Sequence, residues 1–302
     1  MSLHWHMSPA MPTVPSDAPD LFDCAAWATV IGCLGARCWF GIDRENDRRV
    51  SLFVWDKGPV RVGFVGFPVS PMWLLGSTCE QFAQTLNLPE RIDLLRANFS
   101  MLDTGTRSGL QGTSLPESTI PDLASWPIRH QTKNRKDLAL AVRRGVILSN
   151  GTVQDADALF SIYANTIARN RGRLRYNQGY FSALIAMSES RADMQVRVAR
   201  HEENLIGFCV AVKHADRGYY LHAGVADSHR QFGAADILAD DAIRWAMSTG
   251  CRSFSLMASP PNQPGLQKFK QKWAEVDGQW VTSDTPRGLL GRLVWIGLSL
   301  AW

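Results

Sequence analysis

The chain has 302 residues, of which 45% are hydrophobic and 20% are charged, and its net charge is +4. This composition is typical of a globular chain with one large domain or two, and it excludes a low-complexity or fibrous protein. The mildly basic balance permits anionic ligands without requiring them. The six cysteines form no Cys-x-x-Cys pair and have hydrophobic neighbours. They therefore indicate buried free thiols in a reducing compartment, and we expect a cytoplasmic protein without a metal site.

Neither end of the chain is typical of a secretory or membrane-spanning segment. Residues 1–20 are rich in Pro, Ser, Met and His and lack a continuous apolar core, so we expect a disordered leader. Residues 289–302 are apolar, but the segment is too short to span a bilayer and contains Arg292. We expect a helix or strand packed on the protein body, with a membrane-surface anchor as the alternative.

The first half of the chain predicts mainly helix–strand–strand–strand–helix. Lys57-Gly58 lies between two apolar runs and predicts a hairpin. Residues 103–127 are rich in Gly, Ser, Thr and Pro, which predicts a loop with at most one strand. The expected elements are a helix over Leu21–Leu34, strands near Arg37–Ile42, Val50–Trp55 and Val60–Phe67, and a helix over Thr78–Phe99 interrupted at Pro89.

The second half begins with a basic helix, Lys133–Arg144, which Gly145 ends. Thr152-Val153-Gln154-Asp155 resembles a capping box with Asp in place of Glu, and predicts the start of a helix. The expected elements are then a strand from Val146, helices to Arg169 and over Gln178–Glu189, strands Met194–Arg200, Leu205–Val212 and Tyr219–Val225, a helix from Ala234 to Gly250, a strand Arg252–Met257 and a short helix holding Leu266, Phe269 and Trp273.

The segment that joins the Tyr219–Val225 strand to the next helix has the chemistry of an anion site. A short turn leads into Arg230-Gln231-Phe232-Gly233-Ala234-Ala235 and then into an amphipathic helix. This order presents backbone N–H groups at a helix start beside an arginine, which suits a pyrophosphate. Small residues let a phosphate approach the backbone closely. The alternative is an ordinary strand–turn–helix connection with a solvated arginine.

Three segments resemble one family of enzymes. The hexapeptide fits the Arg/Gln-x-x-Gly-x-Gly/Ala signature of GNAT acyltransferases. The basic helix from Asn134 to Val146, the run Tyr219–Gly224 and Gly265–Trp273 are similar to segments of the BioF2-like/CelD-like acetyltransferases, which share a two-lobed, Fem-like architecture. The family's aspartate in the strand after Gly250 is Ser255 here, and its closing glycine is Ala274.

The resemblance implies an α/β (α+β mixed sheet) GNAT fold, with two tandem lobes. We expect a divergent N-terminal lobe over residues 21–132 and a catalytic GNAT domain over residues 133–302. The first-half elements look like a partial copy of the second, although the residues themselves show no repeat. The whole hexapeptide would hold the pyrophosphate of acyl-coenzyme A, and Asn262 would bind its pantetheine arm.

Acyl transfer to an amine also needs a neutral nucleophile and donors for the oxyanion. By position, the family's oxyanion donors would be the backbone N–H groups of Ala223, Gly224 or Val225. His222 is the first candidate for the general base because an unperturbed imidazole titrates near neutrality, and Asp227 and His229 are reserves. A structural histidine, or deprotonation through water, is the alternative.

The remaining roles are less determined by the sequence. The family's tyrosine on the last short helix is replaced by Phe269 or Trp273, so Tyr220 becomes the candidate general acid, with core packing as its alternative. We assign Arg169, Tyr176 and Lys268 to acceptor binding. The arginines at 169, 171, 173 and 175 and the lysines at 268, 270 and 272 are equally explained as solvated surface charges.

The leading hypothesis is an N-acyltransferase that transfers an acyl group, first of all acetyl, from acyl-coenzyme A to an amine of a small molecule, sugar or peptide. The second is a Fem-type aminoacyltransferase that uses aminoacyl-tRNA, for which the arginine-rich loop and basic helix would serve the RNA. The intact signature favours coenzyme A over tRNA. The third is a non-catalytic binding protein with a relic GNAT domain.

Overall fold

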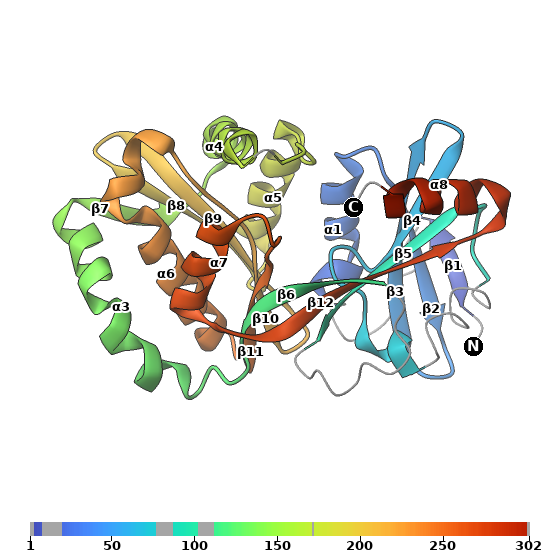
Figure 1. Cartoon of the computed structure of the whole chain (residues 1–302), viewed down its shortest axis with the longest axis horizontal. Helices are drawn as coiled ribbons and strands as arrows, with labels where there is room; N and C mark the ends of the chain where they lie inside the picture. Colours follow the sequence, from blue (N-terminus) through green and yellow to red (C-terminus); the bar gives the residue numbers. More distant parts are fainter. Residues whose placement is uncertain (1–2, 8–19, 77–86, 102–111, 171, 301–302) are drawn as a thin grey trace. The chain divides into compact units, whose positions relative to one another are not determined.

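A computed structural model describes the whole chain except residues 1–2, 8–19, 77–86, 102–111, 171 and 301–302 (Figure 1). The chain forms two compact units. Unit 1 comprises Met1–Leu115 and Gly278–Trp302, and unit 2 comprises Pro116–Asp277. This division differs from the expected boundary at residue 133, because the chain enters unit 2 before the basic helix and returns to unit 1 at its end.

Unit 1 is built on a sheet with the strand order β1-β2-β3-β4-β5-β12. All neighbouring strands are antiparallel except β4 and β5, which are parallel. The turn at Gly58 (φ 62°) joins β3 to β4 and confirms the predicted hairpin. The strands are β1 (His4–Met7), β2 (Arg37–Asp43), β3 (Arg48–Lys57), β4 (Val60–Val65), β5 (Leu94–Met101) and β12 (Glu275–Pro286).

Three expectations for unit 1 differ from the structure. His4–Met7, assigned to a disordered leader, pairs with β2, while residues 8–19 lie outside the described part. The helix predicted over Thr78–Phe99 is wrong at its end, since Leu94–Met101 is strand β5. The first part of that prediction, residues 77–86, is not described. Strand β12 was not predicted, because its polar sequence has no clear alternation.

Short helices accompany this sheet. They are η1 (Leu21–Asp23), α1 (Ala25–Gly32), η2 (Met72–Gly76) and α8 (Gly288–Leu300). Trp27 of α1 is fully buried, and its ring packs on Phe22 with centroids 5.1 Å apart. None of the described helices is long and apolar enough to cross a membrane.

Unit 2 has a sheet with the strand order β7-β8-β9-β10-β11-β6. Here too, only β10 and β11 are parallel. The strands are β6 (Thr113–Ile120), β7 (Val146–Asn150), β8 (Met194–His201), β9 (Asn204–His214), β10 (Arg217–Val225) and β11 (Ser253–Ala258). The helices are α3 (Trp126–Arg143), η4 (Val153–Asp155), α4 (Ala156–Arg169), α5 (Gln178–Ser190), η5 (Asp227–Phe232), α6 (Ala234–Ser248) and α7 (Pro264–Trp273).

The helices of unit 2 cover both faces of its sheet. Cys209 and Ala211 of β9 pack in the same buried cluster as Leu238 of α6. Phe208, the residue before Cys209, instead contacts Phe181 of α5, with ring centroids 5.7 Å apart. Because alternate residues of a strand point to opposite faces, α6 and α5 lie on opposite sides of this sheet. The core of unit 2 therefore has two layers, and β10 has side chains in each.

The two units repeat one plan, as the sequence predicted for the N-terminal lobe. In each sheet the first four strands pair antiparallel with one another. The fifth strand is parallel to the fourth, and the sixth, the closing strand, is antiparallel to the fifth. The closing strand of each sheet comes from the segment that follows the fifth strand of the other sheet. Strand β6 follows β5 in sequence but pairs with β11, whereas β12 follows β11 and α7 but pairs with β5. Neither sheet is therefore completed by one continuous segment.

Candidate functional site

Strands β10 and β11 of unit 2 are paired only over their first residues and then separate. Their parallel pairing covers only Arg217–Tyr219 of β10, and the last pair is Tyr219 with Ser255. Beyond that pair, β10 stays bonded to β9 on its other side up to Val225. This leaves one edge of β10 open over its last residues. A backbone edge without a strand partner offers donors and acceptors to a ligand.

Two of the three predicted oxyanion donors face this open edge. Ala226 N donates to Ile206 O of β9 at 2.8 Å. Because successive N–H groups of a strand point to alternate sides, the N–H of Gly224 also faces β9. Those of Ala223 and Val225 face away from β9. Gly224 has a packing role instead, since a Cβ atom there would lie 2.8 Å from Ile162 of α4.

A bulge at Leu221 separates Tyr220 from His222. The pairing with β9 advances from Ala211 opposite Tyr220 to Val210 opposite His222, so two residues of β10 span one of β9. Tyr220 consequently packs in the α6 cluster, where burial raises its pKa well above 10. His222 lies on the α5 face. The structure therefore does not bring the predicted acid and base together.

His222 lies among aromatic rings. Its Nε2 is 2.8 Å from Tyr180 Oη of α5, and the Tyr176 ring meets it edge-on with centroids 4.7 Å apart. Burial lowers the pKa of His222 to about 3 and raises that of Tyr176 to about 12. The imidazole is therefore neutral at physiological pH. It can accept a hydrogen bond, but it holds a proton only weakly, and its role as a base stays a prediction.

The predicted phosphate turn folds as a 3₁₀ turn, η5, followed by α6. Gly233 has φ 79° in the left-handed region, and no side chain caps the N–H groups of α6. A Cβ at Gly233 would lie 3.2 Å from Ala141 Cβ of α3. The glycine is therefore explained by its backbone conformation and by the closeness of α3, without any ligand. Of the other signature residues, Arg230 and Gln231 are exposed, Phe232 and Ala235 half-buried and Ala234 buried.

Gly233 lies on a turn, but its backbone conformation is one in which any other residue would be strained. We expect Gly233→Glu to lower the free energy of unfolding by about 1–2 kcal/mol, because an L-residue is strained at this φ. Urea denaturation measures the change. Gln231→Glu introduces the same side chain on the exposed part of the turn and serves as control. Equal stability of the two variants would contradict the strain argument.

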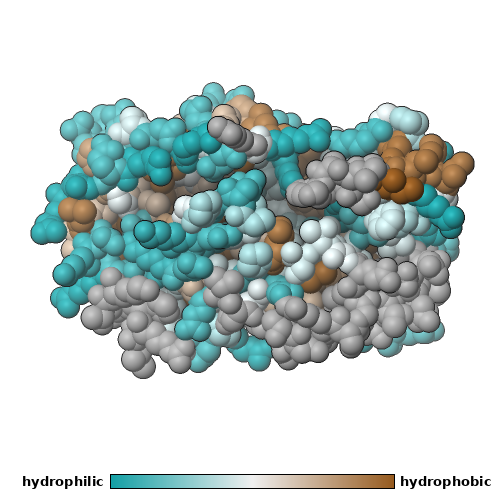
Figure 2. Space-filling model, viewed as in Figure 1, coloured by the Kyte–Doolittle hydropathy of each residue, from teal (hydrophilic) through white to brown (hydrophobic). Residues whose placement is uncertain are grey.

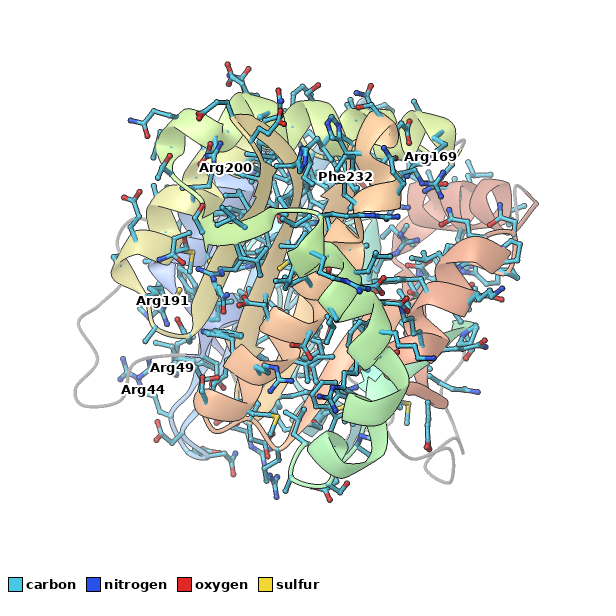
Figure 3. All side chains as sticks on the ribbon, turned by 90° about the vertical axis from the view of Figure 1, so that its left-hand side faces the viewer. Arg44, Arg49, Arg169, Arg191, Arg200 and Phe232 are labelled. Atoms are coloured by element: carbon cyan, nitrogen blue, oxygen red, sulfur yellow. The ribbon has the colours of Figure 1, made fainter. Side chains whose placement is uncertain are left out.

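Exposed arginines surround η5. Arg169 at the end of α4, which Figure 3 labels, forms an ion pair with Asp227 of η5, so the predicted catalytic Asp227 is exposed and paired. Arg230 is exposed on η5 itself, and Arg143 and Arg144 are exposed at the end of α3, the helix that packs on Gly233. Exposed arginines therefore occur beyond the predicted hexapeptide, at the ends of α3 and α4.

The sequence carried no sign of a buried lysine on α7 that bonds to β11. Lys270 of α7 is 6% exposed, and its Nζ donates to Met257 O at 2.9 Å and Ala258 O at 2.7 Å. Burial lowers the pKa of Lys270 to about 7. Met257 has φ 64°, which is unusual for a residue other than glycine. Lys270 thus holds a strained segment of β11, next to the point where β10 and β11 separate.

Two further buried residues complete this arrangement. Ser255 Oγ donates to Glu117 Oε1 of β6 and accepts from Met257 N at 2.9 Å. Glu117 is fully buried and also accepts from Arg217 Nη2 at 3.3 Å. We call Glu117, Arg217, Ser255 and Lys270 the β11 clamp. Ser255, read from the sequence as a departure from the family's aspartate, therefore has a hydrogen-bonding role in the fold.

The other predicted residues lie outside these arrangements. Asn262 and Lys268 are exposed, on the loop after β11 and on α7, and Tyr176 is half-buried beside His222. The binding roles of Asn262 and Lys268 stay predictions. Within the described part of the chain, no group of three or more His, Cys, Asp or Glu residues could hold a metal ion.

Comparisons of the sequence identify the domain that carries this geometry. Residues 129–271 match a family model described as an acetyltransferase (GNAT) domain. The UDP-N-acetylmuramoylpentapeptide-lysine N(6)-alanyltransferase of Weissella viridescens is 23% identical over 202 residues. That match covers 65% of this chain and 57% of the relative, so the chain spans little more than half the length of this curated protein.

Comparisons of the structure extend the likeness to both units. The crystal structure of FemX superposes with a TM-score of 0.58 at 13% identity, covering 92% of this chain and 94% of FemX. A tandem GNAT protein from the clavulanic acid biosynthesis pathway gives 0.50 at 15% identity, covering 92% and 91%. The narrower resemblance to BioF2-like acetyltransferases stays a prediction. With its sheet plan repeated in both units, the chain has the GNAT fold in a Fem-like, two-lobed architecture.

Proposed function

We propose that the chain is a Fem-type aminoacyltransferase that transfers an aminoacyl group from aminoacyl-tRNA to the primary amine of a peptide acceptor. The observation that carries the proposal is the breadth of the arginine surface around η5, from the end of α3 to the end of α4. The phosphates of coenzyme A are few, whereas an RNA backbone presents a phosphate at every nucleotide and suits a wide basic surface. This reverses the preference of the sequence, which favoured acetyl-coenzyme A and made tRNA the alternative.

The relatives support the same choice. The Weissella viridescens protein is named as an alanyltransferase that acts on a lysine of UDP-N-acetylmuramoylpentapeptide. FemX matches nearly the whole chain, and thus both units. A peptide amine as acceptor is the corresponding proposal here. A cytoplasmic location remains an expectation from the free thiols.

The chemistry follows from the open edge of β10. The acceptor nitrogen attacks the carbonyl carbon of the aminoacyl ester, and the N–H groups of Ala223 and Val225 stabilise the oxyanion that forms. The C–N bond forms, the C–O bond to the tRNA ribose breaks, and the proton lost by the amine ends on the ribose oxygen. His222, neutral at physiological pH, orients the amine by accepting a hydrogen bond.

Lys270 is a positioning residue in this proposal. By holding Met257 O and Ala258 O, it keeps β11 away from β10 and leaves the edge accessible. Its pKa of about 7 makes the charge of this amine sensitive to pH in the physiological range.

A donor comparison tests the proposal. Purified protein is incubated with UDP-N-acetylmuramoylpentapeptide and either acetyl-coenzyme A or tRNA charged with a mixture of amino acids. We expect transfer only from aminoacyl-tRNA. Arg230→Glu should weaken tRNA binding on the order of tenfold in a filter assay, and the difference should shrink as salt is raised. Arg252→Glu, which reverses an exposed charge at the opposite end of β10, should bind as the parent does.

Transfer from acetyl-coenzyme A but not from aminoacyl-tRNA would overturn the proposal. It would assign the second candidate, an N-acetyltransferase, which is favoured by the intact Arg230, Gly233 and Ala235 signature. Equal tRNA binding by the parent and Arg230→Glu would remove the arginine surface as the RNA site.

A further inference from the structure

The helix α8 of unit 1 presents an apolar face to solvent. Leu289 is 75% exposed, Leu293 58% and Ile296 49%. Their spacing of four and three residues places them on one side of the helix. Figure 2 shows these apolar side chains gathered over α8. A cluster of large exposed apolar residues on one helix marks an interaction site more often than a single exposed leucine does.

The opposite side of α8 holds the helix on unit 1 by backbone contact. Gly291 is buried, and a Cβ atom there would overlap the carbonyl oxygen of Asp93. At 100° per residue, position 291 lies roughly opposite Leu289 and Leu293. Arg287 N also donates to Asp93 O at 2.7 Å, just before the helix begins. The exposed apolar face is therefore not the face that attaches α8 to the protein.

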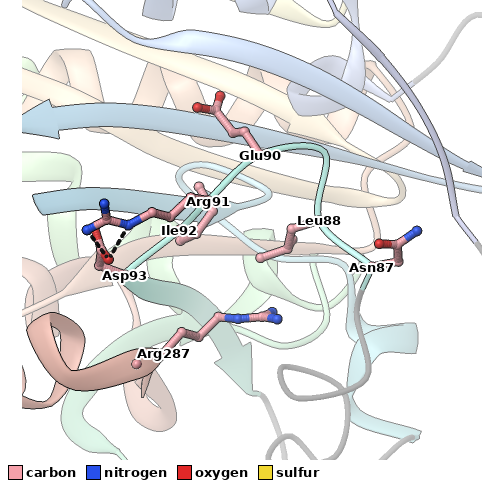
Figure 4. Close-up of a pocket in the computed structure, with 8 residues that line it drawn as sticks. Asn87, Leu88, Glu90, Arg91, Ile92, Asp93 and Arg287 are labelled. Carbon is pink, nitrogen blue, oxygen red and sulfur yellow. Dashed lines mark hydrogen bonds and ion pairs between the residues drawn. The ribbon is translucent and has the colours of Figure 1, made fainter.

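The charged residues on α8 and directly before it are positive. Residues 285–302 include Arg287 and Arg292 and no Asp or Glu. A cavity of about 370 Å³ lies where α8 begins, and Arg91 and Arg287 line it (Figure 4). Two acids, Glu90 and Asp93, also line it. Glu90 accepts from Arg37 and Trp39, and Asp93 pairs with Arg91, so the Arg91–Asp93 pair adds no net charge to the cavity.

We propose that α8 binds the surface of a bilayer that contains anionic phospholipids. The helix lies in the plane of the interface with Leu289, Leu293 and Ile296 among the acyl chains, and its arginines pair with lipid phosphates. The helix has 13 residues, too few to cross the hydrocarbon layer.

A second copy of the chain fits this face less well. In a two-fold dimer the same patch meets itself, so α8 would lie against another α8. The charges on these segments are all arginines, and such a contact would bring like charges together without an acid between them. Anionic headgroups supply the missing countercharge. The inference does not depend on whether the acyl donor is aminoacyl-tRNA or acyl-coenzyme A.

Vesicle flotation tests the proposal with the full chain. We expect binding to phosphatidylcholine vesicles that contain phosphatidylglycerol, and at least tenfold weaker binding to phosphatidylcholine alone. The double variant Leu289→Glu/Leu293→Glu should lose this binding by a similar factor. Val142→Glu/Ile147→Glu introduces the same charges at exposed apolar positions of unit 2 (62% and 68% exposed) and should bind as the parent does.

Circular dichroism verifies that each variant is folded, and Arg292→Ala provides a milder change that should weaken only the preference for anionic lipid. Failure of the folded parent to bind phosphatidylglycerol vesicles would overturn the proposal, as would equal binding by the α8 double variant. Analytical ultracentrifugation tests whether a second copy of the chain covers this face instead. A dimer that the double variant abolishes, in a chain that does not bind vesicles, would assign the face to a second copy.

Discussion

Replacing Lys270 by Met is expected to lower kcat/KM for acyl transfer about a hundredfold, the size of effect typical of losing one well-placed polar group at an active site. Met has a similar length but cannot donate to Met257 O and Ala258 O. The strained segment of β11 at Met257 then loses its hydrogen bonds to Lys270, and β11 can close on the open edge of β10. A steady-state assay with the donor identified above measures the effect.

Lys57→Met is the matched control. It makes the same change at an exposed position of unit 1, outside the proposed site, and should leave kcat/KM within about twofold. The pH profile separates positioning from general destabilisation. The parent should show an inflection near pH 7 that Lys270→Met lacks, because the pKa of Lys270 is about 7. Equal loss in both lysine variants, or an unchanged inflection, would remove Lys270 from the mechanism.

The free energy of unfolding should also depend on the protonation of Lys270. Burial lowers the pKa of Lys270 from 10.5 to about 7, so between these values the unfolded chain binds more protons at this residue than the folded chain. Its contribution to the free energy of unfolding therefore rises with pH from 7 to 10.5, and its destabilising effect is complete below pH 7. Urea denaturation at pH 6.5 and pH 9 should show this rise in the parent and a smaller one in Lys270→Met.

The second large effect is expected at Glu117. In Glu117→Ala, Arg217 stays buried at 7% exposure after losing this carboxylate partner, and Ser255 loses its acceptor. Removing one partner of a buried ion pair costs about 3–5 kcal/mol of unfolding free energy. Chemical denaturation measures the loss.

Two variants calibrate this result. Glu117→Gln keeps an acceptor for Ser255 but removes the charge, so its loss should be smaller than that of Glu117→Ala. Glu203→Ala removes an exposed carboxylate and should change stability by less than about 0.5 kcal/mol. If Glu117→Ala were as stable as Glu203→Ala, the β11 clamp would not be a stabilising feature.

The elements that the sequence predicted correctly depend on nearby residues. The capping box at Thr152 is confirmed, with Asp155 Oδ2 accepting from Thr152 N at 2.9 Å. The Lys57-Gly58 hairpin is confirmed for the same reason, since a positive φ at Gly58 is a local requirement. The strands and helices of unit 2 follow from periodicity within each segment.

What the sequence could not predict depends on distant residues. Strand β5 resembled the end of a helix, and it is a strand because β4 and β12 bond to its two edges. Lys270 lies in a run of alternating lysines that indicates a solvated face, and only the position of β11 reveals that it is buried. Glu117 carried no signal at all, since Arg217 and Ser255 lie 100 and 138 residues further along the chain.

The exchange of closing strands has a consequence for how the polypeptide is made. A ribosome releases the N-terminal end first, and an N-terminal domain can usually fold before the rest has been synthesised. Here β5 bonds to Gln279–Pro286, so residues 1–115 emerge with one sheet edge unpaired and prone to associate with other chains. Unit 1 should therefore finish folding only after the segment that forms unit 2 has been synthesised.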